Sequence, residues 1–118
     1  MHLDFDRLRM YSPVGQVFAI CAVDDPKPVE FADTSITYFL EQINENSDIV
    51  KLCLNFQDII CAEKEGKIAA LLSIEGAEQI ADIDEAYRRG VRIVHMTWNH
   101  DNALCGAAMD SGAGLTQE

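Results

Sequence analysis

Basic residues are scarce in this sequence of 118 residues. Nine lysines and arginines stand against 20 aspartates and glutamates, which gives a formal net charge of −11 at pH 7. Nucleic acids and anionic membrane surfaces would repel such a chain, so neither is expected as a partner. Divalent cations are compatible with this charge, although most of the carboxylates are expected only to solvate the surface.

Long apolar segments are also missing. No run of apolar residues approaches the roughly 20 that a membrane-spanning helix needs. Residues 1–7 carry no basic patch followed by an apolar stretch, so no signal peptide is expected. These two absences predict a cytoplasmic protein without a membrane segment.

The cysteines form no C-x-x-C pair, so a zinc knuckle or a thioredoxin-like motif has no support. There are four of them, at Cys21, Cys53, Cys61 and Cys105. The first two lie in apolar segments typical of strands, where reduced thiols act as small core residues. No cysteine adjoins a basic cluster or an evident helix start that would activate the thiol, so a redox role ranks low.

Apolar runs alternate with amphipathic segments along the chain. The pattern predicts strands over residues 14–23, 49–54, 67–75 and 91–97. Helices are expected between them, with N-terminal caps at Asp33, Asn55 and Asp82 and glycine stops at Gly66 and Gly90. Residues 99–118 contain glycines and show no periodicity, which is typical of a loop.

Single helices between strands that are apolar on both faces imply a parallel sheet with right-handed crossovers. The expected fold class is therefore α/β, in one domain that spans residues 1–118. A (β/α)8 barrel needs roughly 250 residues and eight such units, so about four parallel strands correspond to a partial barrel. A small open α/β sheet is the alternative.

One carboxylate, Glu75, ends the apolar strand predicted over residues 67–75. The carboxyl end of a parallel strand is where ligands and metals bind, and a buried glutamate there needs a cation or a hydrogen-bond donor. Strand alternation places Ser73 on the face of Glu75, whereas Leu72 and Ile74 face the helices. Residue 75 is therefore the first candidate for chemistry.

Four motifs follow one another around this glutamate. They are QVFA at residues 16–19, GKIAALLSIEG at 66–76, YRRGVR with MTWN and a further asparagine within 87–102, and GAGLT at 112–116. In this order and spacing they resemble the membrane (renal) dipeptidase family of zinc metallopeptidases, whose fold is a (β/α)8 barrel. The resemblance runs over nearly the whole chain, from about the second to the fourth barrel strand and the loop that follows.

The resemblance implies a metal role for Glu75. In that family two zinc ions lie at the C-terminal mouth of the barrel, and one glutamate, here Glu75, bridges them. Two carboxylate oxygens can hold two cations roughly 3.5–4 Å apart, and the metals polarise a peptide carbonyl and activate a bridging water. The implied activity is hydrolysis of dipeptides with zinc as the cofactor, and Gly76 is expected to let the backbone turn tightly at the metal rim.

The residues after the last predicted strand are candidates for the substrate pocket. They are Trp98, Asn99 and Asn102, and many family members have a histidine where this sequence has the tryptophan. The asparagines either bond the substrate or simply cap the loop. The position three after the glutamate, often histidine in the family, is Glu78 here.

The family's remaining zinc ligands have no counterpart in this sequence. They are a His-x-Asp on the first barrel strand, two histidines on later strands and a late aspartate. His95 is expected to face the helical layer if Trp98 faces the barrel interior, where a satisfied interfacial histidine is the better interpretation. His100, in a loop near the mouth beside Asp101, is the better candidate for an additional ligand.

Two hypotheses follow for the chain alone. Each zinc takes about four ligands, so a chain with one of them is expected to be an inactive part of a metallodipeptidase. The alternative is a non-catalytic half-barrel, whose open sheet edges and uncovered apolar face make it pair with itself or with a missing half. A homo-oligomer is expected in that case, for example two half-barrels in a symmetric dimer.

Overall fold

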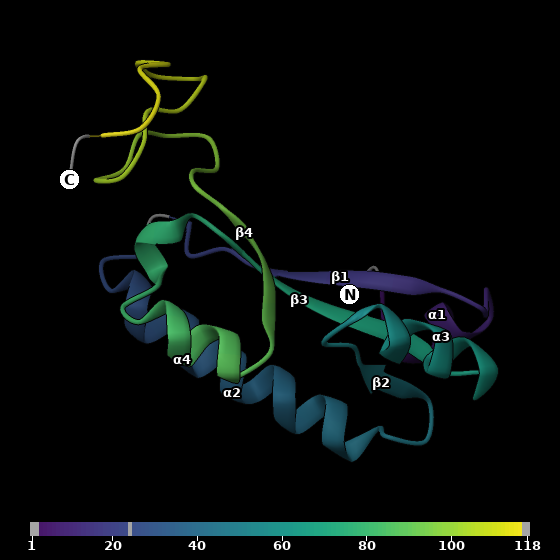
Figure 1. Ribbon diagram of the computed structural model, residues 1–118. Helices are drawn as coiled ribbons and strands as arrows, with labels where there is room; N and C mark the ends of the chain where they lie inside the picture. Colours follow the sequence, from purple (N-terminus) through teal and green to yellow (C-terminus); the bar gives the residue numbers. More distant parts are fainter. Residues whose placement is uncertain (1–2, 24, 117–118) are drawn as a thin grey trace.

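The structure is a computed structural model that describes residues 3–23 and 25–116. Its sheet contains four parallel strands, β1 (Gly15–Ile20), β2 (Val50–Leu52), β3 (Ile68–Glu75) and β4 (Val91–His95). Around it lie helices α1 (Phe5–Arg9), α2 (Pro28–Glu45), α3 (Phe56–Lys64) and α4 (Ile83–Arg88), and the 3₁₀ turn η1 (Ala77–Gln79) (Figure 1). The predicted α/β class, with four parallel strands alternating with helices, is confirmed.

The sheet is organised around β3. β1 pairs with one edge of it, from Gly15 opposite Ala69 onward. The other edge is shared, because β2 pairs with the first residues of β3 and β4 with its last residues, where His95 lies opposite Glu75. The first two strands in the chain, β1 and β2, therefore do not pair with each other. The three strands that meet near Glu75 form an arc in the order β1–β3–β4.

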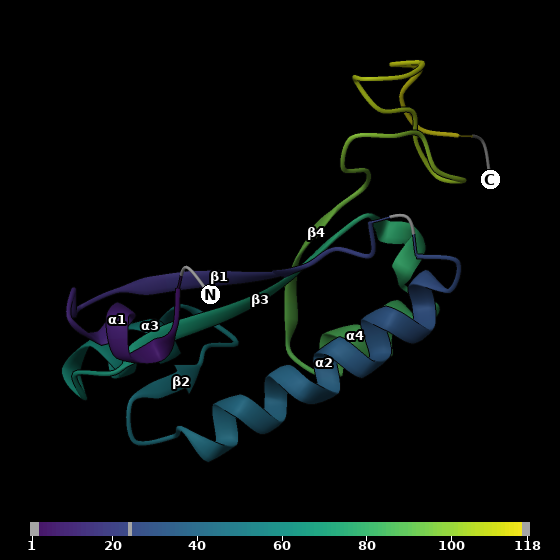
Figure 2. The ribbon, with the colours of Figure 1, turned by 180° about the vertical axis from the view of Figure 1, so that it is seen from behind.

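The helical layer covers one face of this arc. Leu72 and Ile74 of β3 are almost completely buried and pack against Ile36 of α2 and Ala86 of α4. The two helices lie on the same side of the sheet, as Figures 1 and 2 show from opposite directions. The predicted contact of Leu72 and Ile74 with the helices is confirmed.

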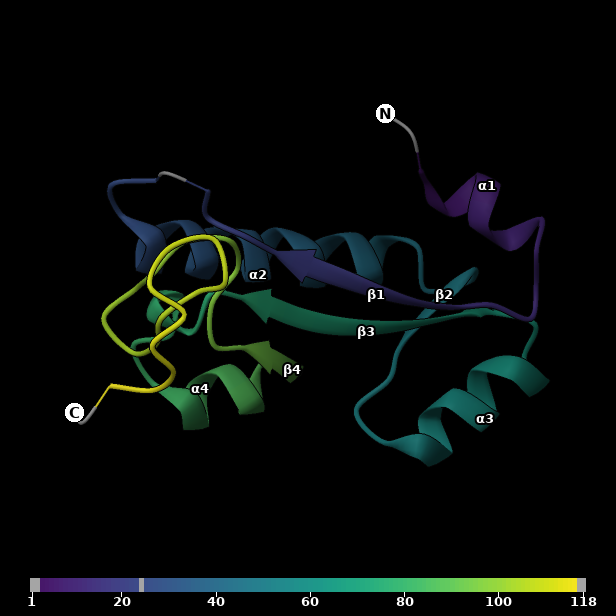
Figure 3. The same ribbon diagram turned by 90° about the horizontal axis from the view of Figure 1, so that it is seen from above.

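Helix α3 lies on the opposite face but reaches only the first half of β3. There Ala69 packs with Ala62 of α3 and with Cys53. Seen from above, α3 stands beside the start of β3 and far from the arrowhead (Figure 3). The half of this face that carries Ser73 and Glu75 is thus left free of α3.

The caps predicted for the two later helices are confirmed. The Asn55 side chain accepts a hydrogen bond of 3.0 Å from the Asp58 N–H, and Asp82 accepts bonds of 2.9 and 3.0 Å from the N–H groups of Asp84 and Glu85. The glycine stops follow with left-handed backbone, at φ of 68° for Gly66 and 102° for Gly90.

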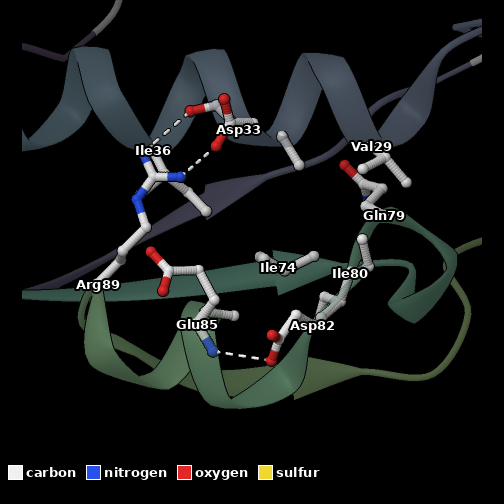
Figure 4. Close-up of a pocket in the computed structure, with 12 residues that line it drawn as sticks. Val29, Asp33, Ile36, Ile74, Gln79, Ile80, Asp82, Glu85 and Arg89 are labelled. Atoms are coloured by element: carbon white, nitrogen blue, oxygen red, sulfur yellow. Dashed lines mark hydrogen bonds and ion pairs between the residues drawn. The ribbon is translucent and has the colours of Figure 1, made fainter.

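The predicted cap at Asp33 is wrong. Helix α2 begins earlier, at Pro28, where a residue without an N–H is accommodated because the first turn leaves that group unbonded in any case. Asp33 lies inside the helix and forms an ion pair with Arg89, which follows α4 (Figure 4). None of the helices in the described ranges has the length and apolar character that crossing a bilayer demands.

Candidate functional site

Glu75 lies at the C-terminal rim of the parallel sheet, as the last residue of β3. Its side chain is 28% exposed and shares a face with Ser73, away from α2 and α4. It borders a pocket of about 300 Å³ between the end of β1, the turn after β3 and the loop after β4. The carboxylate therefore has access to a space large enough for a small ligand.

The turn after Glu75 requires a glycine. Gly76 has a φ of 101°, a conformation that side chains other than glycine rarely adopt. A Cβ there would also lie 2.7 Å from Oε1 of Glu78, whose side chain folds back over the turn. The backbone turns tightly at Gly76, and the turn brings a second carboxylate, Glu78, to the pocket.

A glutamine that sequence reasoning missed closes the same turn. Gln79 is 3% exposed, and its Oε1 accepts a hydrogen bond of 3.0 Å from the Ala22 N–H beyond the end of β1. Its Nε2 donates to the carbonyl oxygens of Glu75 and Gly76, at 3.1 Å in the second case. The only sequence signal was a polar side chain directly after a buried strand, and no periodicity marks such a residue.

His95 lies on the face of Glu75, so the prediction that it faces the helices is wrong. It is the register partner of Glu75, its side chain is 55% exposed, and its Nδ1 is 3.9 Å from Oε1 of Glu75. The prediction counted alternation back from Trp98, but β4 ends at His95. The alternation of side chains between the two faces of the strand therefore ends before Trp98.

The residues predicted to line the substrate pocket gather around the same cavity. Trp98, Asn99 and Asn102 all border the pocket that contains Glu75, and half of the Trp98 surface is exposed. These residues come from the loop after β4, which rises beyond the end of the sheet (Figure 1). The structure thus brings together the glutamate and all three residues predicted to line the pocket.

Asn102 holds this loop in place. Its Nδ2 donates to the Glu78 carboxylate and, at 2.7 Å, to the Met96 carbonyl. Its Oδ1 accepts from the N–H groups of Leu104 and Cys105 at 2.9 and 3.0 Å. Asn102 therefore caps the loop and borders the pocket at the same time.

Two aspartates organise the remainder of the loop. Asp110 accepts a hydrogen bond of 2.8 Å from the Asp101 N–H and lies 3.1 Å from Nδ1 of His100, and these contacts, in that order, lower the pKa of Asp110. Hydrogen bonds from the Ser111 hydroxyl and then from the Ala107 N–H lower the pKa of Asp101. One nitrogen of His100 is therefore directed to Asp110 rather than to Glu75.

The thiol of Cys21 also borders the pocket. Its partial burial, followed by the nearby charges of Glu75 and Glu78, raises its pKa. Burial likewise raises the pKa of Cys53. Both thiols are thus held in the protonated, less nucleophilic form, and no disulfide joins any of the four cysteines.

The described residues do not complete a metal centre. In residues 3–23 and 25–116, no three histidine, cysteine, aspartate or glutamate side chains are grouped so that they could hold an ion. Glu75 and His95 offer two donors of types that zinc accepts, whereas a catalytic zinc usually has three protein ligands. A dinuclear zinc centre therefore does not fit these residues alone.

A second pocket lies on the helical side of the sheet (Figure 4). Its volume is about 110 Å³, and apolar side chains such as Ile36, Ile74 and Ile80 form much of its wall between α2 and α4. Its charged side chains already have partners, since Arg89 is paired with Asp33, Glu85 with Arg88, and Asp82 caps α4. The pocket around Glu75 is thus the better candidate for chemistry.

Comparison with known proteins identifies a family and two similar sequences. The model of the family described as membrane dipeptidase (Peptidase family M19) matches residues 1–118. An uncharacterized protein in the PQQ-III 3′ region of Acinetobacter calcoaceticus is 29% identical, over 99% of this chain and 47% of that protein. Dipeptidase ataJ of Aspergillus terreus is 29% identical, over 91% of this chain and 30% of that protein.

A solved structure shares the fold. An amidohydrolase from Pseudomonas aeruginosa superposes with a TM-score of 0.85 at 22% identity, over 96% of this chain and 35% of that one. The chain therefore spans less than half the length of each of these three proteins.

Proposed function

The chain belongs to the membrane dipeptidase family, peptidase family M19, and we propose that it is part of a zinc-dependent dipeptidase to which it contributes Glu75 as a metal ligand. The observation that carries the proposal is the position of Glu75. It ends a parallel strand at the rim of the sheet, in a pocket, within a chain that matches the family over its whole length. The similarity to a protein named as a dipeptidase supports dipeptides as the substrate class.

The other zinc ligands come, in this proposal, from outside the 118 residues. Two facts support this: the chain spans less than half of its relatives, and its described residues bring no three metal donors together. The 118 residues form a single partial catalytic domain. By themselves they are expected to hydrolyse no dipeptide.

The loop after β4 forms the substrate wall of the site. Trp98, Asn99 and Asn102 border the same pocket as Glu75, which supports a role for them in orienting a peptide beside that carboxylate. An indole face gives apolar contact and the two amides give hydrogen bonds, which suits a small substrate with a peptide group.

The test uses the protein expressed from the complete reading frame that contains this sequence. Glu75→Gln is expected to lower kcat/KM on a panel of dipeptides on the order of 100-fold or more, and to lower the zinc content, because the amide loses the charge that binds the cation. Glu63→Gln is the matched control, since Glu63 is exposed on α3. A Glu75→Gln variant with unchanged activity and zinc content would contradict the proposal, as would zinc-dependent hydrolysis by the 118 residues alone.

Self-association is the second candidate function, and an open edge favours it. β1 is the last strand on its side of the sheet within the described residues, and Val17 is 42% exposed on it. A second copy could pair along this edge and pack against the exposed face that carries Val17. Because each chain carries a charge of −11, the association should tighten with salt. Light scattering that shows a monomer at high protein and salt concentration would rule it out.

A further inference from the structure

We propose that Glu78 is a specificity-determining residue, whose carboxylate binds an ammonium group of the substrate. The inference rests on the proposed function, because its ligand is the dipeptide of the same pocket. It assigns a role to a side chain that borders this pocket beside Glu75 and that needs no metal to act. Members of the family often have a histidine at this position, so the role belongs to this chain and not to the family as a whole.

The Glu78 carboxylate is held in place by one of its two oxygens. Asn102, in the loop after β4, donates a hydrogen bond from Nδ2 to Oε2. The other oxygen, Oε1, lies over the turn, 2.7 Å from the place of a Cβ on Gly76. Among the residues that the structure describes, no N–H or O–H donates to Oε1, and no cationic side chain pairs with the carboxylate. One oxygen therefore fixes the side chain, and the other is open to a donor from a ligand.

The pocket beside Glu78 carries an excess of negative charge. Three further carboxylates border it, and within the described residues no lysine or arginine does; the three are Asp25, Glu75 and Asp101. Their charge acts across the pocket, since burial and then the charges of Glu75 and Glu78 raise the pKa of the Cys21 thiol on the β1 side. A ligand group that enters beside Glu78 therefore meets a field that attracts a cation and repels an anion.

An ammonium group matches this wall in charge and in hydrogen bonding. It has three donors and no acceptor, whereas an open carboxylate oxygen accepts. A hydrogen bond that involves charged groups is about twice as strong as one between neutral groups. Half of the Trp98 surface is exposed at the same pocket, and an indole face also attracts a cation.

A dipeptide can offer this group from two sources. Its N-terminal end always carries an ammonium group, and a lysine side chain carries a second one. The carboxylate end of the dipeptide finds no cationic side chain among the residues that border the pocket. The ammonium group is thus the charged part of the substrate that faces the turn after β3.

The experiment measures binding by the metal-free protein, expressed from its complete reading frame and treated with a chelator, so that zinc takes no part in the result. Calorimetry compares alanyl-alanine with propionyl-alanine, which lacks only the amino group, and alanyl-lysine with alanyl-norleucine, which lacks only the side-chain ammonium. Glu78→Gln is the variant, because its amide oxygen still accepts from Asn102 while the charge is lost. Glu63→Gln removes the same charge from the exposed side of α3 and is the matched control.

The wild type is expected to bind the ammonium-bearing member of at least one pair about 10-fold more tightly, as a hydrogen bond to a charged group allows. The first pair reports on the N-terminal ammonium and the second on the side chain. Glu78→Gln is expected to lose most of this preference, and Glu63→Gln to keep it.

Three results would overturn the inference. They are equal binding within both pairs, no measurable binding of any of the four compounds, and a preference that Glu78→Gln keeps. A preference that Glu63→Gln loses to the same extent would also overturn it, because the net charge and not Glu78 would then be the cause. A complete protein that binds with the expected preference but hydrolyses no dipeptide with zinc would instead overturn the proposed function.

Discussion

His95 lies opposite Glu75 in the register of β4 and β3, with its Nδ1 3.9 Å from the Glu75 Oε1. This distance is too long for a hydrogen bond, so the two side chains stand next to each other without being joined. Both point to the face that α2 and α4 do not cover. Imidazole nitrogens and carboxylate oxygens are both ligand types that zinc accepts.

Replacing His95 tests whether it supports the metal site. His95→Gln is expected to weaken zinc binding by the complete protein about 10-fold, because a neighbour of Glu75, the ligand that we propose, is lost. His100→Gln is the matched control and is expected to leave the affinity unchanged, since a ring nitrogen of His100 is directed to Asp110. A chelator-competition titration measures both. A loss of zinc affinity in His100→Gln, with unchanged affinity in His95→Gln, would contradict this prediction and make His100 the additional ligand.

The hydrogen bond between Asn102 and Glu78 is expected to fix the loop after β4 to the turn after β3. Asn102→Asp keeps the acceptor for Leu104 and Cys105, but it loses the donor to Glu78 and to the Met96 carbonyl and sets two carboxylates side by side. Each lost hydrogen bond costs about 1 kcal/mol, and the two carboxylates repel each other, so the loop should loosen. Trp98 is the single tryptophan and reports on this loop, and its emission should shift to the red and become more easily quenched.

Glu78→Gln is the control for that variant. Its amide oxygen still accepts from Asn102, so the Trp98 emission should stay as in the wild type. An Asn102→Asp protein with wild-type emission and quenching would show that the Glu78 contact does not anchor the loop.

Acid is expected to loosen the loop after β4. The folded protein holds the pKa of Asp101 and of Asp110 below the ordinary aspartate value, so their contacts stabilise the loop fully above that value, about pH 3.9, and are lost as the pH falls through the lower folded pKa. The amide shifts of Ala107 and Asp101, whose N–H groups bond these carboxylates, should follow the loss. Midpoints at or above about 3.9 for both amides would contradict the assignment.

Core packing on the helical side of β3 should dominate stability. Leu72 is 0% exposed, and Leu72→Ala is expected to lower the free energy of unfolding by about 2–5 kcal/mol. Val17→Ala, on the uncovered face at 42% exposure, is expected to cost less than about 1 kcal/mol. Urea unfolding measures both. A Val17→Ala cost as large as that of Leu72→Ala would mean that this face is buried in solution, as a second copy would bury it.

Strong local patterns made much of the fold predictable from the sequence. The apolar run before Glu75 predicted β3, because a strand that is buried on both faces contains few polar residues. The caps Asn55 and Asp82 marked two helices, because a side chain that accepts from the first turn acts through neighbours in sequence. Such signals do not depend on distant parts of the chain.

The features that sequence reasoning missed depend on distant contacts. Asp33 is a good capping residue, yet its partner is Arg89 in another element. β2 lies on the edge of β3 that β4 also uses, which no local pattern encodes. Gln79 bonds Ala22 across the end of the sheet, and His95 takes its orientation from a strand that stops before Trp98.

The most direct test is to locate zinc in crystals of the protein expressed from its complete reading frame and grown with the metal. Anomalous diffraction at the zinc edge is expected to show density within about 2.0–2.2 Å of the Glu75 carboxylate oxygens. Zinc bound elsewhere, with the Glu75 carboxylate touching no metal, would contradict the account.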